Sequence, residues 1–234
     1  MTLSPLRRFL VAALLWLPFA FFIWFWFAAP LVWPVIFIAK RVLLDFWPQL
    51  FTAVSQGADL LDAQGHVREH AGYLMQLSTS VFVNAAPAGE PARFGFIEPT
   101  VNPMVYGYGL PLFAGLCLAA PGSRRRRLGE LALGFAVLLP AQAFGVIAEC
   151  LKIIVIDTGV SGAEAAQRAA LSPNLIALCY QFGYLILPSL VPTVLWIACN
   201  RPFIQELVQR ERTEPARAGG VEALATGTGS GRER

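Results

Sequence analysis

Long apolar runs are the feature that most constrains this chain. Several stretches reach the roughly 20 residues that cross a bilayer core while carrying almost no charge. Of 234 residues, 56% are hydrophobic and 14% charged, and the mean hydropathy is +0.57. This is more apolar surface than a soluble core of this size buries. The sequence therefore predicts an α-helical integral membrane protein with about four transmembrane helices and a small β-rich periplasmic domain between the first and second spans.

The first apolar run, from Phe9 to Ala39, is too long for one straight span, since about 20 residues cross the hydrocarbon core. We expect a transmembrane helix first, after which Pro30 and Pro34 turn the chain into a second segment. A cleavable signal peptide is the competing interpretation. The apolar run argues against a signal peptide, because the run is long and bulky and continues past the candidate cleavage site.

The predicted organisation has five parts, and it rests on changes of polarity along the chain. Charged residues within the second segment favour an interfacial position there, and β-branched and aromatic stretches at 73–83 and 93–101 favour strands in the one long polar segment. The parts are an N-terminal transmembrane helix at 1–30, an interfacial amphipathic helix at 31–54, a periplasmic β-rich domain at 55–102, a three-helix transmembrane region at 103–200, and a cytoplasmic helix with a disordered tail at 201–234.

The orientation follows from the arginines, which accumulate on the cytoplasmic side of inner-membrane proteins. In a model with four spans, the N-terminus, the arginine run at 124–127 and the flank after 200 fall on one side. We therefore place the protein in a bacterial inner membrane with both termini in the cytoplasm. As a short loop, the arginine run is more simply a determinant of topology than a nucleic-acid site, and no nucleic-acid partner is predicted.

The segment GHVREH contains His66, Glu69 and His70 in the HxxEH pattern of a zinc-dependent protease. That chemistry requires a helix, which sets the histidines one turn apart. The surrounding sequence instead predicts a β-hairpin with Gly65 in its turn. On a strand the histidines stand about 13 Å apart, at roughly 3.3 Å per residue. We therefore predict no metal site, no catalytic residue and no cofactor.

Polar residues in the predicted spans are the remaining candidates for function, because unpaired polar groups are costly in lipid. Glu149 and Lys152 are three residues apart, and we expect them to pair with each other. Gln181 is expected to hydrogen-bond to Gln142 on the third span as packing between helices. The alternative is a membrane-embedded enzyme or transporter that uses Glu149, Lys152 and Asp157 near the outer face. The four cysteines fall in apolar runs and are interpreted as small buried hydrophobes.

Two segments resemble a known family. NPMVYGYGLPL at 102–112 and YQFGYLILPSLVPTVLW at 180–196 are similar to the exosortase H-associated membrane proteins, and the resemblance covers roughly residues 95–200. It implies a non-enzymatic accessory role in envelope protein sorting, in which the chain binds the sorting enzyme or its substrate, and it carries over no catalytic residue. Under this view Asn102, Tyr106 and Tyr108 set the geometry of the external domain on the bilayer.

Overall fold

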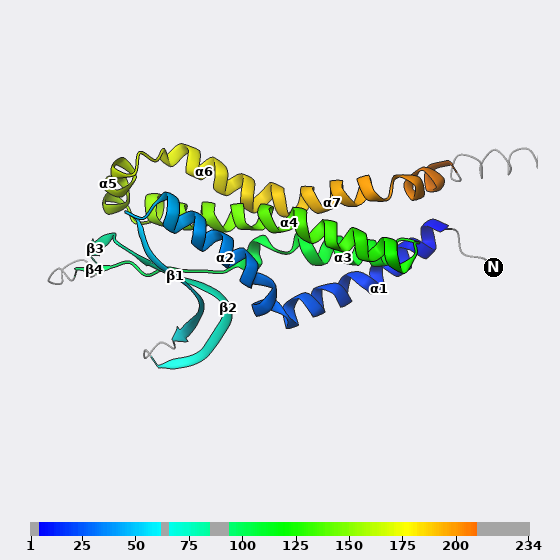
Figure 1. Ribbon diagram of the computed structural model, residues 1–234, viewed down its shortest axis with the longest axis horizontal. Coiled ribbons are helices and arrows are strands. Elements are labelled where there is room, and N and C mark those ends of the chain that lie inside the picture. Colours follow the sequence, from blue (N-terminus) through cyan, green and yellow to red (C-terminus); the bar gives the residue numbers. More distant parts are fainter. Residues whose placement is uncertain (1–4, 62–65, 85–93, 210–234) are drawn as a thin grey trace, which may run out of the picture.

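The computed structural model describes residues 5–61, 66–84 and 94–209. The molecule is elongated, with helices running along its long axis and strands gathered near one end (Figure 1). The α-helices are α1 (Pro5–Trp26), α2 (Ala28–Phe46), α3 (Gly109–Ala119), α4 (Arg124–Lys152), α5 (Val160–Arg168), α6 (Pro173–Gln181) and α7 (Leu187–Cys199). The other labelled helical elements are a 3₁₀ helix, η1 (Pro103–Tyr106), and two π-helical segments, η2 (Ile153–Asp157) and η3 (Phe182–Ile186). A further helical stretch covers 201–209.

Within the described residues, three helical segments are long and apolar enough to cross a membrane: Leu6–Trp26, Arg124–Asp157 and Pro173–Cys199. The second of the four expected spans, at the start of the 103–200 region, is not among these three segments. It contains η1, a turn at 107–108 and then α3, which at 11 residues is only about 16 Å long at 1.5 Å per residue. A bilayer core is about 30 Å thick, so α3 alone reaches about halfway.

The break between the first two helices lies earlier than expected. It falls at Phe27, with φ −98° and ψ 29°, whereas Pro30 and Pro34 both lie within α2. Pro30 is in the first turn, where backbone N–H groups lack intrahelical acceptors in any case, so a proline is tolerated there. The end of α2 is set by Pro48, because the residue before a proline disfavours the α conformation.

The strands form two small antiparallel sheets. One has the order β1 (Phe51–Leu61), β2 (Val67–Thr79), β5 (Thr100–Val101), and the other pairs β3 (Phe82–Asn84) with β4 (Phe94–Phe96). The hairpin and both strand-forming stretches are thus confirmed, while Gly65 lies outside the described residues. The first strand differs from expectation, since residues 51–54 belong to β1 and not to an interfacial helix.

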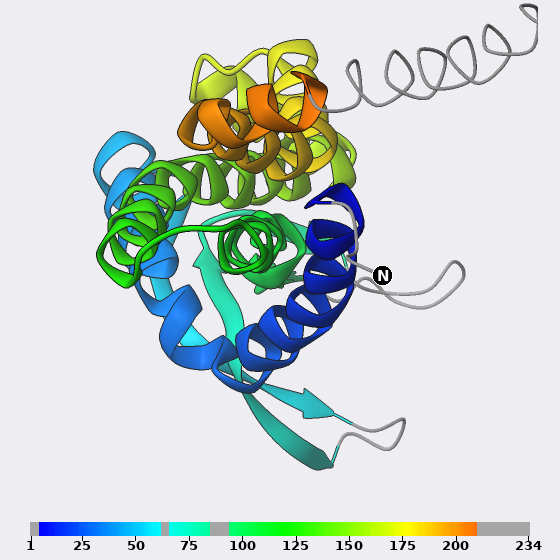
Figure 2. The same cartoon turned by 90° about the vertical axis from the view of Figure 1, so that its right-hand side faces the viewer.

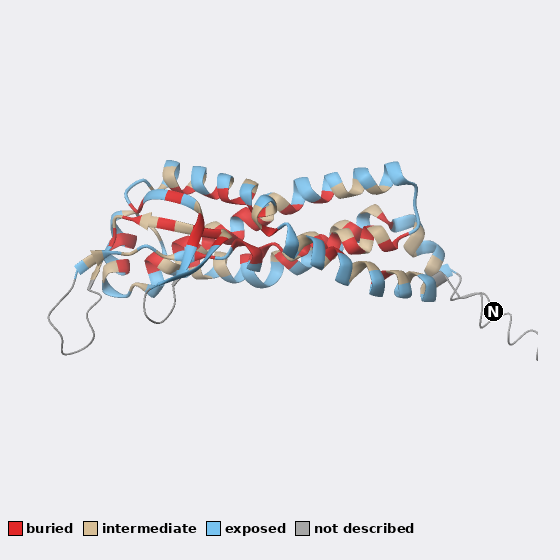
Figure 3. Ribbon diagram, turned by 90° about the horizontal axis from the view of Figure 1, so that it is seen from below, coloured by how far each residue is buried: buried red, intermediate tan, exposed pale blue. Residues whose placement is uncertain are grey.

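Among the described residues, two larger hydrophobic cores follow one another along the molecule, and a small third cluster lies on the β1–β2 hairpin. The sheet-end core joins one face of α2, the larger sheet, the second half of α4 and α5, with Val35, Ala39, Leu43, Met75, Leu77, Val146 and Ile154 among its buried members. The arginine-end core contains Phe113, Cys117, Ala120, Leu138 and Trp196. Buried residues accordingly line the interior from end to end (Figure 3). Seen along the axis, α3 lies between α1, α4 and α7 (Figure 2).

The sheet is therefore part of a mixed helix-and-sheet core, and α2 is one of its walls. The outward face of α2 carries Trp33 and Phe37 together with Lys40 and Arg41. The connection at 157–173 contains α5, a short alanine-rich helix. The tail beyond Gln209 lies outside the described residues.

Candidate functional site

The candidate site lies where the two cores meet, between η1, α4 and the π-helical segment η3. Tyr106 is 3% exposed, and its hydroxyl donates a hydrogen bond to Oε2 of Glu149 on α4. Burial first, and then the neighbouring Glu149 carboxylate, raise the pKa of Tyr106 above its ordinary value, so the hydroxyl keeps its proton. This contact joins residues 43 positions apart.

Aromatic rings from α6 and η3 extend the site. The ring of Tyr184 meets that of Tyr106 edge-on at 6.0 Å between centroids, and Tyr180 stacks on Tyr184 at 5.6 Å. Such edge-to-face and offset pairs contribute beyond the apolar area they bury. The three rings therefore hold η1 and α6 in a fixed position on α4.

Two glycines allow this close approach. An added Cβ at Gly145 would lie 2.4 Å from Cδ1 of Tyr106, and one at Gly183 would lie 2.8 Å from Cα of Gly145. Real Cβ atoms do not occupy such distances, so α4 and η3 cross at a point that only glycine permits. Small residues serve the same purpose where transmembrane helices pack closely. The signal for this crossing in the sequence is a glycine within each of the two apolar segments, at 145 and 183.

Gln142 is buried, and its Nε2 donates to the carbonyl oxygen of Pro103 at 3.0 Å. The expected partner, Gln181, is exposed instead. The amide of Gln142 is instead used by η1, through the carbonyl oxygen of Pro103. Gly107 makes room for this amide, because a Cβ there would lie 2.4 Å from Nε2 of Gln142.

Lys152 does not pair with Glu149 as expected. Its Nζ lies 2.8 Å from Oδ2 of Asp157 and 5.1 Å from the centroid of the Tyr180 ring. The segment between Lys152 and Asp157 is the π-helical η2. In a π-helix the hydrogen bonds run between residues five apart, and this wider turn brings residues five apart toward the same face.

The remaining predicted residues shape the backbone around η1. Asn102 caps this helix, with its Oδ1 accepting from the backbone N–H of Met104 at 3.1 Å. Tyr108 occupies the position before α3 and makes no side-chain cap. Together, these residues connect strand β5 to the short helix α3.

From Val67 onward the histidine segment is a strand, as predicted, and His66 comes directly before that strand. His70 lies on β2 opposite Asp59 on β1, and its Nδ1 is 2.8 Å from Oδ1 of Asp59. His66, Glu69 and His70 are exposed. Across residues 5–61, 66–84 and 94–209, no three His, Cys, Asp or Glu side chains are arranged to hold a metal ion.

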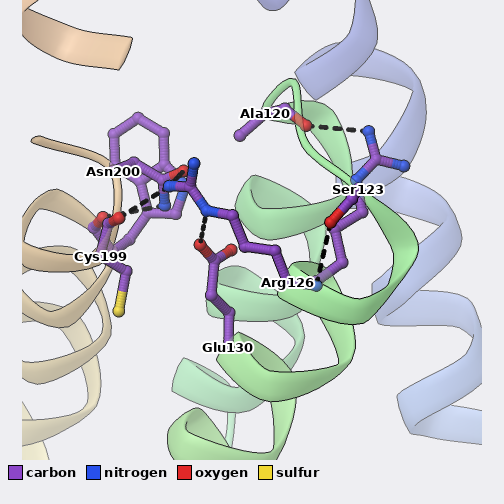
Figure 4. A network of polar contacts seen from close by, with 8 residues as sticks. Ala120, Ser123, Arg126, Glu130, Cys199 and Asn200 are labelled. Atoms are coloured by element: carbon purple, nitrogen blue, oxygen red, sulfur yellow. Dashed lines mark hydrogen bonds and ion pairs between the residues drawn. The ribbon is translucent and has the colours of Figure 1, made fainter. Parts of the chain in front are cut away.

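The arginine run forms a second polar network, at the opposite end of α4 (Figure 4). Ser123 caps α4, and the guanidinium of Arg126 contacts Glu130 at 2.7 Å and the carbonyl oxygen of Cys199 at 2.8 Å. Arg127 donates to the carbonyl oxygen of Ala120 at 2.9 Å. Two of the four consecutive arginines thus fasten the start of α4 to the end of α7 and to the α3–α4 connection.

A cavity beside the candidate site is too small for a substrate. It has a volume of about 10 Å³ and is lined by Tyr106, Gly107, Gly109, Leu110, Leu138, Ala141, Gln142, Leu187 and Pro188. Such a volume holds about one water molecule. The arrangement therefore suits the packing of helices more than the binding of a reactant.

Three apolar helices of membrane-crossing length in the described part of the chain define a multi-pass helical membrane protein. A family model described as exosortase H-associated membrane protein matches residues 3–203. The chain therefore belongs to this family, and the resemblance of its two segments is confirmed. No curated protein and no solved structure matches the chain.

Proposed function

We propose that the protein is a non-enzymatic accessory component of an exosortase-type envelope protein-sorting system and that it binds the sorting enzyme or its substrate. Membership of a family named for its association with exosortase H supports this proposal. We call the candidate site, where the two cores meet, the junction. The observation that carries the non-enzymatic part of the proposal is that the polar side chains at the junction are paired within the protein. Tyr106 is bonded to Glu149, Gln142 to Pro103 and Lys152 to Asp157.

The proposed setting is a bacterial inner membrane, with the arginine end in the cytoplasm and the sheet end in the periplasm. Support comes from the charge distribution, because α1 and α4 start and α7 ends beside arginines (Figure 1). A helix needs about 20 residues to cross the hydrocarbon core, and the same number of residues counted back from Cys199 at the cytoplasmic end of α7 places Tyr180 at the opposite, outer boundary. The tyrosines of the site and Trp24 at the end of α1 then lie at the outer interface, where Tyr and Trp are enriched.

In this setting the second half of α4, α2, α5 and the sheets project as one unit beyond the membrane. The unit is anchored at the Tyr106–Glu149 contact, and a periplasmic partner would dock on it at a height fixed by the membrane helices. The proposed role of the junction is to hold this orientation.

The test is crosslinking in native membranes, followed by purification of the tagged protein and identification of a co-purified sorting enzyme or sorted substrate. Glu149→Gln retains an acceptor oxygen for Tyr106, whereas Tyr106→Phe removes only the donor. We expect Glu149→Gln to keep the partner and to support sorting. We expect Tyr106→Phe to reduce recovery of the partner in proportion to its loss of thermal stability. If no sorting enzyme or substrate is recovered with the wild type, the proposal is wrong.

One observation favours the alternative of a membrane-embedded enzyme or transporter. Two π-helical segments, η2 and η3, flank the polar cluster, and such segments often occur at functional sites. In that case Glu149 must gain or lose a proton or bind a ligand. Glu149→Gln would then abolish activity while leaving the folded protein and its partner in place.

A further inference from the structure

A larger cavity opens at the arginine end, far from the junction. Its volume is about 400 Å³, and it is lined by Arg8, Phe9, Ala12, Ala119, Pro121 and Phe203. It lies between the start of α1, the end of α3 and the helix at 201–209. The volume falls in the range typical of ligand sites, about 300–1,000 Å³. The walls are apolar except for one arginine.

The aromatic wall of this cavity is fixed by packing. The ring of Phe9 stacks on Trp196 at 5.5 Å between centroids, and Phe203 meets Phe9 edge-on at 5.4 Å. Trp196 is itself a buried member of the arginine-end core. A ligand would therefore enter a preformed space, which lowers the ordering cost of binding.

The charge around the cavity is strongly positive. The arginine end carries Arg7, Arg8, Arg124, Arg125, Arg126, Arg127 and Arg201 against Glu130 and Glu206. Arg126 and Arg127 are engaged by the protein's own oxygens. Arg8, Arg124 and Arg125 are exposed and form no ion pair with any residue in the described part of the chain. This leaves guanidinium groups for an external anion.

We propose that this cavity binds an anionic phospholipid of the leaflet that faces the arginines. The lipid phosphate pairs with Arg8, and Arg124 and Arg125 add positive charge a few residues after the lining Pro121. An acyl chain lies against Phe9 and the neighbouring apolar wall. Arginine suits a phosphate because its planar guanidinium can donate two parallel hydrogen bonds. Basic pockets between transmembrane helices on the cytoplasmic side bind anionic headgroups in this way.

Native mass spectrometry of the full-length protein in mild detergent tests the proposal. The protein is titrated with phosphatidylglycerol or with phosphatidylcholine of the same acyl chains, and retained lipid is counted. We expect preferential retention of phosphatidylglycerol, and a decrease of about fivefold in its affinity with Arg8→Gln, as for one cation near an anionic lipid. The control is Arg41→Gln, an exposed arginine on α2 that contacts the Phe37 ring. Equal retention of both lipids would overturn the proposal.

A second pair of variants separates the cavity from diffuse attraction. Ala12→Phe fills the cavity without changing charge, while Val11→Phe introduces the same aromatic side chain at an exposed position of α1 outside the lining. We expect only Ala12→Phe to lower retention of phosphatidylglycerol. Equal effects of the two variants would show that no specific cavity is used. Competition by soluble glycerol phosphate as effective as the lipid itself would show an anion site without a lipid, which also contradicts the proposal.

Discussion

Gly145→Ala is the sharpest test of the junction. The added methyl group would lie 2.4 Å from Cδ1 of Tyr106 and 3.2 Å from the carbonyl oxygen of Gly183. Tyr106 cannot easily give way, because it is buried and its hydroxyl is bonded to Glu149. The substitution therefore pushes η3 away from α4 and also breaks the Tyr106–Glu149 contact.

Three terms set the magnitude. Overpacking costs about 1–3 kcal/mol, and losing a hydrogen bond to a charged group costs about 1.5–3 kcal/mol. Alanine recovers about 1 kcal/mol over glycine inside a helix. If both costs apply, the net destabilisation is about 1.5–5 kcal/mol.

The control is Gly129→Ala on the same helix, where an added Cβ meets nothing within 4 Å. Gly129→Ala gains only the helix propensity of alanine. The difference in stability between the two variants therefore measures the cost of overpacking together with the lost hydrogen bond. Thermal unfolding in lipid nanodiscs measures it, and we expect Gly145→Ala to melt at least about 3 °C below the wild type, at roughly 2–4 °C per kcal/mol. If Gly145→Ala melts with or above Gly129→Ala, the close crossing of α4 and η3 is refuted.

Three further predictions concern other parts of the chain. Asn102→Ala removes the cap of η1 and should cost about 1 kcal/mol of stability in thermal unfolding, whereas Asn102→Asp should keep the cap. Arg126→Met should destabilise the protein by about 1–3 kcal/mol through the lost contacts to α7, and Arg125→Met, at an exposed position, should leave its melting temperature unchanged. In a background without other cysteines, Glu164→Cys should react with an impermeant maleimide in intact spheroplasts and Arg125→Cys only after permeabilisation; the opposite pattern would reverse the proposed orientation.

The sequence predicts features that depend on local composition. Apolar runs locate the long helices, and the strand-like segment around His70 excludes the helix that a zinc site would need. The resemblance at 102–112 and 180–196 also points to the right elements, because these segments become η1 with α3 and η3 with α7. The two segments do not indicate how these elements contact one another.

The missed features depend on distant contacts or on irregular backbone. The partner of Tyr106 is 43 residues away, and no local pattern specifies that distance. The α-helical spacing of three residues predicts that Lys152 pairs with Glu149, but the π-helical turn brings Lys152 to Asp157 instead. The short length of α3 arises from the turn at 107–108, within a run whose composition alone suggests a full span.

The continuity of α4 explains how a small sheet can keep a fixed position above a membrane. The helix contributes Leu138 to the arginine-end core and Leu151 to the sheet-end core. Between these positions it receives the Gln142–Pro103 and Tyr106–Glu149 contacts from η1. Tilting the sheet against the membrane helices would therefore have to bend α4 or break both contacts. Substitutions that break these contacts should for this reason impair partner binding before they disrupt the sheet, because they release its orientation while its own hydrogen bonds remain.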